Sequence, residues 1–269
     1  MRKKTIASII LAAGYGSRMK NYKGNKTLLP LTVGGDLYKG KNLVISEVIR
    51  NLPEGPKAIV VNYRKDEVIA ATSSSNVFYY EQPAANGTGG ALISALEFFK
   101  NLDSDYCIIT MGDVPFVQRE TYKKLVKGLG ENQIVVLGFK PLNKAQYGLL
   151  DITDGSVKGI IEWRYWREYP IERQNRLTIC NSGIYAVERL ALMKYLPILE
   201  TMPHYVEKLR DGQRILIEEY FITDLIQLMA DDGLNIGFNM VESANEVMGI
   251  DTEEDLITAQ KFYREMKKR

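Results

Sequence analysis

The sequence predicts an α/β fold built on a Rossmann-like, mixed but mainly parallel sheet that is flanked by helices. The first observation is an alternation of apolar, strand-like runs with helical patterns in the first half of the chain. The strands are expected at residues 5–11, 57–61, 77–80 and 106–111. The helices are expected at residues 42–52, 65–71 and 90–101. Such alternation is typical of a parallel sheet covered by helices on both faces.

The second observation is a change of pattern from residue 133 onward. Three strand-like segments follow one another, at 133–139, 147–153 and 157–163. The residues Thr-Asp-Gly-Ser between the last two have the composition of a tight turn, which joins antiparallel strands. This change predicts a substrate-facing lobe around residues 133–187, added to the mainly parallel sheet.

The rest of the chain is expected to complete the same domain. Residues 218–233 have the pattern of an amphipathic helix, 234–241 of a strand and 252–268 of a charged helix. The segment 163–175, which holds both tryptophans and a proline, is expected to be a loop, and His204 to lie near a helix start. Because the sequence contains no repeat, low-complexity tract or linker, it predicts a single domain over residues 1–269.

Composition and charge exclude several classes of protein. A 269-residue chain with 45% hydrophobic and 25% charged residues can bury a large core and is not disordered. A net charge of +2, with acids and bases interleaved, provides no strong field for nucleic acid or an anionic membrane. One histidine and two distant cysteines support neither a zinc site nor a disulfide framework. The N-terminal apolar run is too short for a membrane span, and we expect a cytoplasmic protein.

A glycine-rich loop follows the first strand. In LAAGYGSRM, residues 11–19, the glycines would let the backbone approach a phosphate closely and present amide donors. Arg18 and Lys26 add a guanidinium, which can bind phosphate bidentately, and an ammonium. The loop lacks the third glycine of a dinucleotide fingerprint and the Gly-Lys-Ser/Thr of a Walker loop. Taken alone, it is either a phosphate site of another type or a strand-to-helix turn without a ligand.

The loop and several further motifs, in the same order along almost the whole chain, resemble the sugar-phosphate nucleotidylyltransferases. The similarity is greatest to the uridylyltransferase domain of bacterial N-acetylglucosamine-1-phosphate uridylyltransferase. Beyond the loop, the matching positions are 26 with 28–30, 81–82, 87–89, 111–115, 147–148, 162, 181–183, 219–224 and 249–252. The resemblance implies a fold of the nucleotide-diphospho-sugar transferase type and an enzyme of nucleotide-sugar biosynthesis.

The implied reaction is the Mg²⁺-dependent transfer of a nucleotidyl group from UTP to a sugar-1-phosphate, with N-acetylglucosamine-1-phosphate favoured. The attacking phosphate has a second pKa of about 6, so it is largely ionised at pH 7 and needs no general base. Instead, cations, backbone amides and a divalent metal must bring two polyanions together and stabilise the leaving pyrophosphate. A chain with a single histidine can meet these requirements.

Two aspartates are the metal-binding residues that the resemblance implies. Asp113 follows the strand-like run 106–111, where ligands bind in open α/β sheets. Asp251 stands where the uridylyltransferase usually has Asn, and a carboxylate there would suit a hard cation equally well. From the residues alone, Asp113 would be a turn residue and Asp251 the N-cap of a helix, a role compatible with metal binding.

The resemblance also implies the residues that bind the two substrates. Arg18 and Lys26 are the catalytic cations, with Lys20 and Lys23 as alternatives because Asn25 stands where the family has Pro. The nucleotide-binding residues are Leu11, Ala13, Gly14, Gly16, Ser17, Gln82, Gly87 and Thr88. The sugar-binding residues are Gly148, Glu162, Asn181 and Thr223. Gln82 would read the base with an amide that can donate and accept at once.

Two departures from the family leave the base open. Ala85 and Gly90 stand where the family commonly has Gln and His. A cytidylyltransferase acting on another phosphorylated substrate is therefore the enzymatic alternative, and a nucleotide-binding regulator is the non-enzymatic one. A glycosyltransferase is disfavoured because its Asp-x-Asp motif, at 103–105, precedes the strand 106–111 instead of following it. The left-handed β-helix with acetyltransferase activity, which commonly follows this domain in the closest family, is expected to be absent.

Overall fold

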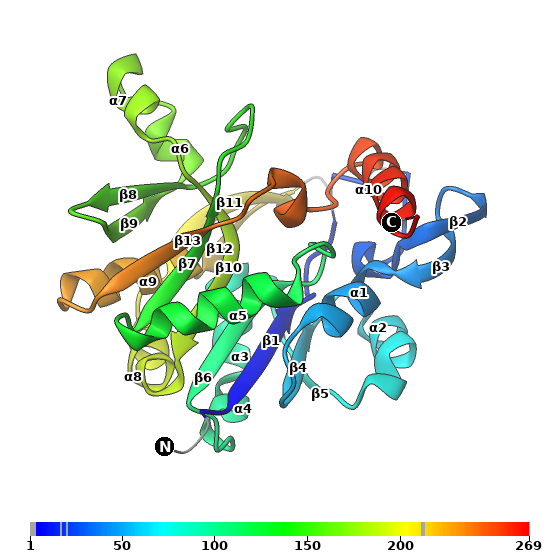
Figure 1. The fold of residues 1–269 in the computed structure, drawn as a ribbon, viewed down its shortest axis with the longest axis horizontal. Coiled ribbons are helices and arrows are strands. Elements are labelled where there is room, and N and C mark those ends of the chain that lie inside the picture. Colours follow the sequence, from blue (N-terminus) through cyan, green and yellow to red (C-terminus); the bar gives the residue numbers. More distant parts are fainter. Residues whose placement is uncertain (1–3, 17, 20, 211–212, 269) are drawn as a thin grey trace.

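The computed structural model describes residues 4–16, 18–19, 21–210 and 213–268 (Figure 1). Within these residues, the main sheet has nine strands, and its central path runs in the order β13-β7-β10-β6-β1-β4-β5. The strands paired in parallel in the first half are β1 (Ile6–Leu11), β4 (Lys57–Val61), β5 (Phe78–Glu81) and β6 (Tyr106–Met111). β10 (Cys180–Glu188) is antiparallel to both of its neighbours on that path, β6 and β7 (Ile134–Phe139). β13 (Ile236–Met240) is parallel to β7, so the sheet is mixed but mainly parallel, as predicted.

The burial of β1 on both faces of the sheet explains why its sequence is a continuous apolar run. Ala7, Ile9 and Leu11 pack on one face of the sheet, whereas Ile10 and the following Ala12 pack on the other. Successive side chains of a strand point to opposite faces, so a sheet covered on both faces needs apolar residues at nearly every position. The predicted strands of the first half agree with the structure within one residue at each end for this reason.

Helices cover both faces of the main sheet (Figure 1). One face carries α3 (Gly87–Ser94), α4 (Leu96–Lys100), α8 (Arg189–Leu199) and α9 (Ile222–Asp231). The other face carries α1 (Val44–Asn51), α2 (Lys65–Thr72) and α5 (Arg119–Lys127). The single helix predicted over 90–101 is in fact two helices, because the N–H of Ala95 bonds the carbonyl of Leu92 at 3.1 Å and tightens the last turn of α3.

Two hairpins that were not predicted from the sequence lie outside the main sheet. They are β2 (Pro30–Asp36) with β3 (Lys39–Leu43), and β11 (His204–Arg210) with β12 (Gln213–Glu219). His204 begins β11, opposite Glu219 of β12, so the expectation that it lies near a helix start is wrong. Both hairpins begin at or just after a proline, which marks a break but does not say which element follows.

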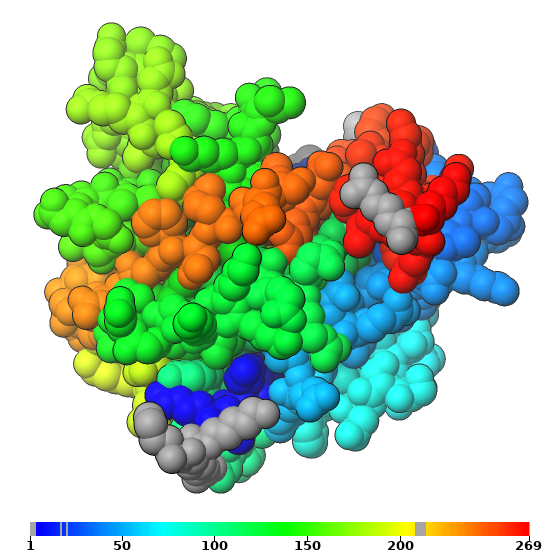
Figure 2. Space-filling view, viewed as in Figure 1, coloured from blue at the N-terminus to red at the C-terminus, as the bar shows by residue number. Residues whose placement is uncertain are grey.

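The predicted antiparallel hairpin of the second half is present as β8 (Leu149–Thr153) and β9 (Ser156–Ile161). Its turn holds Asp154 and Gly155 at φ values of 52° and 75°, the left-handed conformation that Asp and Gly adopt more readily than other residues. The segment expected to be a loop forms two short helices, α6 (Trp163–Trp166) and α7 (Ile171–Arg176), which project from the body of the molecule (Figures 1 and 2).

The last helix, α10 (Glu253–Met266), packs against the distant β2–β3 hairpin (Figure 2). The side chain of Gln260 donates hydrogen bonds to the carbonyl oxygens of Pro30 and Leu37, at 2.8 and 3.0 Å. The helix begins with a capping box between Thr252 and Asp255. Its N-cap is therefore Thr252, and the interpretation of Asp251 as the N-cap is wrong.

Two further expectations concern the cysteines and membrane spans. Cys107 and Cys180 are buried and unpaired, as their apolar surroundings predict, and burial raises the pKa of the Cys180 thiol to about 11. In the part of the chain that the structure describes, no helix is both long and apolar enough to cross a membrane.

Candidate active site

The predicted metal ligands meet at the carboxyl edge of the main sheet. β1 and β6 are adjacent and parallel, so both end there, and Gly112 after β6 donates its N–H to the carbonyl of Leu11 at 2.9 Å. Asp113 comes next and is 8% exposed. Its carbonyl accepts the N–H of Ile250 at 3.1 Å, which brings Asp251 to the same place from the end of the chain.

Lys26 lies between these two carboxylates. Its Nζ donates to Oδ1 of Asp251 at 2.7 Å and also bonds Oδ2 of Asp113. Arg18 reaches the same oxygen of Asp251 with Nη2, at 2.9 Å, from a largely exposed side chain. The four residues Arg18, Lys26, Asp113 and Asp251, which we call the charge cluster, thus include partners 225 positions apart in the sequence.

The charge of Lys26 is maintained by its partners. Burial by itself would lower the pKa of the ammonium, because the charged form loses hydration. The charges of Asp113 and Asp251 and their hydrogen bonds outweigh this effect, so the pKa of Lys26 is raised above its ordinary value. Lys26 is therefore a fixed cation in a largely buried position.

The glycine-rich loop lies directly against this cation. The predicted nucleotide-binding residues in the described part of the loop are Leu11, Ala13, Gly14 and Gly16. Gly16 has a φ of 62°, and a Cβ on it would lie 3.6 Å from the side chain of Lys26. A Cβ on Gly14 would meet no atom of the described residues within 4 Å. The predicted Ser17 lies outside the described residues.

Asn25 determines how Lys26 enters the site. Its side-chain oxygen accepts the N–H of Thr27 at 3.0 Å, which begins a short 3-10 helix (Lys26–Leu28). Its amide nitrogen donates to the carbonyl of Tyr63 at 2.8 Å, so the start of the helix is tied to the loop after β4. Asn25 thus provides a defined conformation at the position where the resembling family has Pro.

The structure distinguishes the three candidate lysines as far as they are described. Lys23 has an exposed side chain, and Lys20 lies outside the described residues. Lys26 is the lysine that the structure places in contact with both aspartates.

Gln82 follows β5 at the same edge of the sheet, and only 3% of the residue is exposed. Its Nε2 donates one hydrogen bond to Oδ1 of Asn86, at 2.7 Å, and one to the carbonyl of Gly87, at 3.0 Å. Because an amide NH₂ has two hydrogens, both donors are used within the protein. Gln82 can therefore only accept a hydrogen bond from a ligand, which corrects the expectation that it both donates and accepts.

The turn at residues 86–89 is clamped to Tyr220. The backbone N–H and C=O of Tyr220 each bond the backbone of this turn at 2.8 Å. Gly87 has a φ of 91°, and a Cβ on it would lie 2.4 Å from the carbonyl oxygen of Tyr220. The hydroxyl of Thr88 accepts the N–H of Ile222 at 3.3 Å. The predicted residues Gly87 and Thr88 are thus positioned by the segment that leads into α9.

The four predicted sugar-binding residues lie together around Glu162. A Cβ on Gly148 would be 3.8 Å from both carboxylate oxygens of Glu162, and the carbonyl of Gly148 accepts the N–H of Asn181 at 2.8 Å. Burial raises the pKa of Glu162, while a hydrogen bond with Thr223 and the charge of Arg164 offset part of this effect. We call Gly148, Glu162, Asn181 and Thr223 the neutral-ligand cluster, because the side chains of the last three offer hydrogen bonds suited to uncharged hydroxyl and amide groups.

Two observations place the neutral-ligand cluster near the charge cluster. A Cβ on Gly183, two residues after Asn181, would lie 3.4 Å from Met111 at the end of β6. Burial raises the pKa of Tyr147, which adjoins Gly148, and the charge of Asp251 raises it further. The two clusters therefore lie close together at the carboxyl edge of β6.

The neighbourhood of the neutral-ligand cluster includes residues that sequence reasoning missed. Nε2 of His204 lies 2.8 Å from Oδ2 of Asp224, and its ring packs edge-on against Phe221. The guanidinium of Arg164 also lies over the ring of Phe221, 5.1 Å from its centroid. Only the match at 219–224 pointed toward this region, because a lone histidine on an unpredicted hairpin carries no spacing signal.

The charge cluster fits a divalent metal of the Mg²⁺ type. Carboxylate oxygens of Asp113 and Asp251 already converge on one cationic atom, Nζ of Lys26, so they face a common position. Among the described residues, no group of three or more His, Cys, Asp or Glu side chains could hold a metal. Mg²⁺ is commonly bound by one or two carboxylates with substrate phosphates and water, so two aspartates are a sufficient protein contribution.

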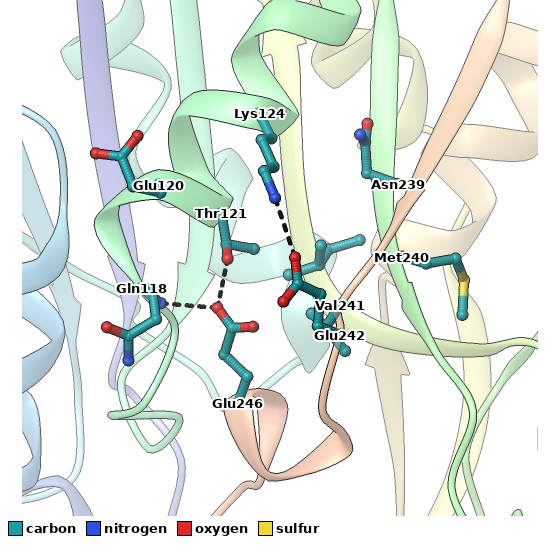
Figure 3. Close-up of a pocket in the computed structure, with 10 residues that line it drawn as sticks. Gln118, Glu120, Thr121, Lys124, Asn239, Met240, Val241, Glu242 and Glu246 are labelled. Atoms are coloured by element: carbon teal, nitrogen blue, oxygen red, sulfur yellow. Dashed lines mark hydrogen bonds and ion pairs between the residues drawn. The ribbon is translucent and has the colours of Figure 1, made fainter. Parts of the chain in front are cut away.

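A separate pocket against α5 has a structural explanation (Figure 3). Glu246 points toward the first turn of α5, where its Oε1 accepts the N–H of Gln118 at 3.0 Å and the hydroxyl of Thr121. Lys124 lies 3.3 Å from Glu242 across the same pocket. The positive end of the helix is thus neutralised by a residue of the chain itself.

The chain matches a known family over its first half. Residues 8–150 match the MobA-like NTP transferase domain. The chain belongs to this family. The protein is accordingly a nucleotidyltransferase, as its motifs predict.

Relatives along the full length support the same assignment. The bifunctional protein GlmU of Sulfurimonas denitrificans is 30% identical over 264 residues, which cover 97% of this chain and 54% of that protein. The GlmU of Dichelobacter nodosus is 28% identical over 270 residues, 99% of this chain and 53% of that protein. The chain therefore spans about half the length of these curated relatives.

Solved structures show the fold. The uridine diphosphate N-acetylglucosamine pyrophosphorylase of Trypanosoma brucei has a TM-score of 0.71 at 14% identity, over 95% of this chain and 65% of that one. A nucleotidyl transferase from Methanothermobacter has a TM-score of 0.59 at 20% identity, over 97% and 99% of the two chains. The predicted nucleotide-diphospho-sugar transferase type of fold is confirmed.

Proposed function

We propose that this nucleotidyltransferase transfers UMP from UTP to a sugar-1-phosphate, with N-acetylglucosamine-1-phosphate favoured, and releases pyrophosphate. The observation that carries the proposal is the charge cluster beside the glycine-rich loop, joined to the neutral-ligand cluster around Glu162. Cations beside a loop of backbone amides suit a triphosphate, whereas carboxylate and amide side chains suit the hydroxyl and N-acetyl groups of a sugar.

In the proposed reaction, an oxygen of the sugar phosphate attacks the α-phosphorus of the nucleotide. The new P–O bond forms as the bond from the α-phosphorus to the β-phosphate oxygen breaks, and pyrophosphate leaves with the electron pair. Arg18 and Lys26, with the backbone of the glycine-rich loop, would bind the triphosphate and stabilise the charge that develops on it. No proton has to be removed, because the attacking phosphate is largely ionised at neutral pH.

Asp113 and Asp251 would hold Mg²⁺ in this reaction. When bound, the metal would supply further positive charge to the phosphates and orient them for in-line displacement. The ammonium of Lys26 bonds both aspartates in the structure, and with Mg²⁺ held by Asp113 and Asp251 this ammonium would be available to bind the triphosphate.

The name of one structural neighbour agrees with the choice of substrates. The GlmU proteins are similar to this chain over nearly its whole length, and the protein from Trypanosoma brucei is a uridine diphosphate N-acetylglucosamine pyrophosphorylase. Gln82 would accept a hydrogen bond from the base, with Gly87 and Thr88 beside it. Gly148, Glu162, Asn181 and Thr223 would orient the sugar.

A pyrophosphate-release assay tests the proposal. The purified protein is incubated with Mg²⁺, each of the four common nucleoside triphosphates and a panel of sugar-1-phosphates. We expect the highest turnover with UTP and N-acetylglucosamine-1-phosphate. Higher turnover with CTP would identify the cytidylyltransferase alternative. Nucleotide binding by calorimetry with no turnover for any pair would overturn the enzymatic proposal in favour of the regulator.

A further inference from the structure

The orientation of the Gln82 amide is set by its neighbours. One hydrogen of Nε2 goes to the carbonyl oxygen of Gly87, which can only accept, so the nitrogen must lie on that side. The other hydrogen goes to Oδ1 of Asn86 at 2.7 Å. The amide oxygen, Oε1, therefore lies on the opposite side, away from the turn.

This oxygen is available to a ligand. Among the described residues, Ser104 Oγ is the one fully buried side-chain oxygen or nitrogen that lacks a hydrogen-bond partner. No donor of the described chain bonds Oε1 of Gln82, so this atom accounts for part of the small exposed area of an otherwise buried residue. A buried side chain whose free acceptor reaches the surface is suited to reading a ligand.

The absence of a side chain at Gly90 leaves room for the side-chain amide of Asn86. A Cβ on residue 90 would lie 1.9 Å from Oδ1 of Asn86 and 2.5 Å from its Cγ, so the two cannot coexist in this arrangement. The φ of Gly90 is not positive, and its position in α3 would suit alanine. The glycine is thus required by the position of the Asn86 amide and not by backbone conformation.

We propose that Asn86 is a positioning residue for base selection and that Gly90 permits this role. The inference rests on the proposed function, in which Gln82 reads the base. By holding Nε2, Asn86 ensures that Gln82 presents only an acceptor. An acceptor is complementary to the N3–H of uracil, whereas cytosine has a lone pair at N3 and would be opposed by it.

Removal of Asn86 would leave only the Gly87 carbonyl to orient the amide. The second hydrogen of Nε2 would then have no acceptor in the protein, so the amide could swing about its one remaining bond and offer this hydrogen to the N3 lone pair of cytosine. The measurement is the ratio of kcat/KM for UTP to that for CTP. In Asn86→Ala we expect this ratio to fall about tenfold, the equivalent of one misplaced hydrogen bond. Asn86→Asp, which keeps the acceptor, should retain the ratio within about threefold.

Gly90→Ala tests the same mechanism without altering either amide residue. The added methyl group would displace the Asn86 side chain, so the ratio should fall as in Asn86→Ala. The double variant should lose no more than either single variant, because both act through one hydrogen bond. Asn101→Ala and Gly130→Ala are matched controls, since Asn101 is exposed and a Cβ on Gly130 would meet no described atom within 4 Å. Unchanged ratios in Asn86→Ala and Gly90→Ala, or additive losses in the double variant, would overturn the inference.

A second measurement separates this inference from the proposed function. In protein labelled with ¹⁵N-glutamine, the side-chain NH₂ signal of Gln82, identified by its loss in Gln82→Ala, should exchange slowly with water. Exchange should become fast in Asn86→Ala and Gly90→Ala but not in Asn86→Asp. If no nucleotide is turned over, the proposed function fails while this result still decides whether Asn86 holds Gln82. Fast exchange in the wild-type protein would contradict the positioning role.

Discussion

The charge cluster and the neutral-ligand cluster differ in the kind of group that each is suited to bind. In the charge cluster, Lys26 forms hydrogen bonds and ion pairs with both aspartates, and this pairing stabilises charged groups in a largely buried position. In the neutral-ligand cluster, Glu162 is the single carboxylate and lies beside Gly148 and the hydroxyl of Thr223, while the charges that act on it belong to Arg164 and Asp224 outside the cluster.

The difference indicates what each cluster loses when one member is removed. A buried charge that loses its partner is costly, so changes in the charge cluster should affect both the reaction and the stability of the fold. A lost hydrogen-bond partner of a sugar hydroxyl should affect the binding of one substrate. Single substitutions in the two clusters test this contrast.

Asp113→Ala should have the largest effect. Turnover in the pyrophosphate-release assay should fall by about three orders of magnitude or more, because one of two metal carboxylates is removed. The fold should persist, as judged by circular dichroism, since the bond from Ile250 to residue 113 involves backbone atoms only. Asp66→Ala, at an exposed helical position, is the control. Retention of most activity would refute the metal-binding role of Asp113.

Lys26→Met should impair both activity and stability. Without the ammonium, Asp113 loses the cation that bonds it and Asp251 keeps only the exposed Arg18, so the two carboxylates repel and the Tm without Mg²⁺ should fall by several degrees. Addition of Mg²⁺ should recover more Tm in this variant than in the wild type, because the metal replaces the lost cation. Lys23→Met, at an exposed position, should behave like the wild type. Equal Mg²⁺-induced shifts in Lys26→Met and wild type would show that the metal does not bind between these aspartates.

Glu162→Gln should affect one substrate only. The KM for the sugar-1-phosphate should rise about tenfold, because an ionised acceptor for hydroxyl groups is lost, while the KM for UTP stays within about twofold. An equal rise in both values would contradict the division of the site into two clusters. Asn181→Ala is a useful companion, since its amide also contacts Tyr185 and Gly183 and its loss should be less selective.

Glu162 should also make the KM for the sugar-1-phosphate depend on pH. Burial raises the pKa of Glu162, so its carboxylate is protonated, and its strength as an acceptor reduced, at a higher pH than for an ordinary glutamate near 4.3. As the pH is lowered, the KM for the sugar-1-phosphate should therefore begin to rise above that value in the wild type. The titration of the sugar phosphate itself is common to wild type and Glu162→Gln, so the difference between their profiles isolates Glu162. Identical profiles would exclude this role.

Thr252→Ala should have the smallest effect. It removes the N-cap of α10, which costs about 1 kcal/mol of stability, and loosens the residue next to Asp251. The Tm should fall by a few degrees, with a modest loss of turnover. Thr258→Ala is the matched control, because the hydroxyl of Thr258 bonds only a carbonyl of its own helix. A larger stability loss in the control would contradict the capping argument.

Much of the fold could be predicted because its signals are local. The parallel strands are apolar runs buried on both faces, and the turn of the β8–β9 hairpin contains the residues that its backbone conformation requires. The order of motifs likewise predicted the family, and Asp113 could be placed at the sheet edge because it directly follows β6. Such features depend on a few adjacent residues and on general rules of sheet geometry.

Other features depended on contacts between distant segments. The pairing of Lys26 with Asp251 spans 225 positions and arises only when the segment before α10 docks on the loop after β6. Gln82 is restricted to accepting by the amide of Asn86 and the carbonyl of Gly87, which its own sequence position does not reveal. Local sequence therefore determined which chemical groups stand at the ends of the strands. Their protonation, their orientation and the partners that occupy their hydrogen bonds were decided by tertiary packing, because these properties belong to pairs of residues and not to single ones.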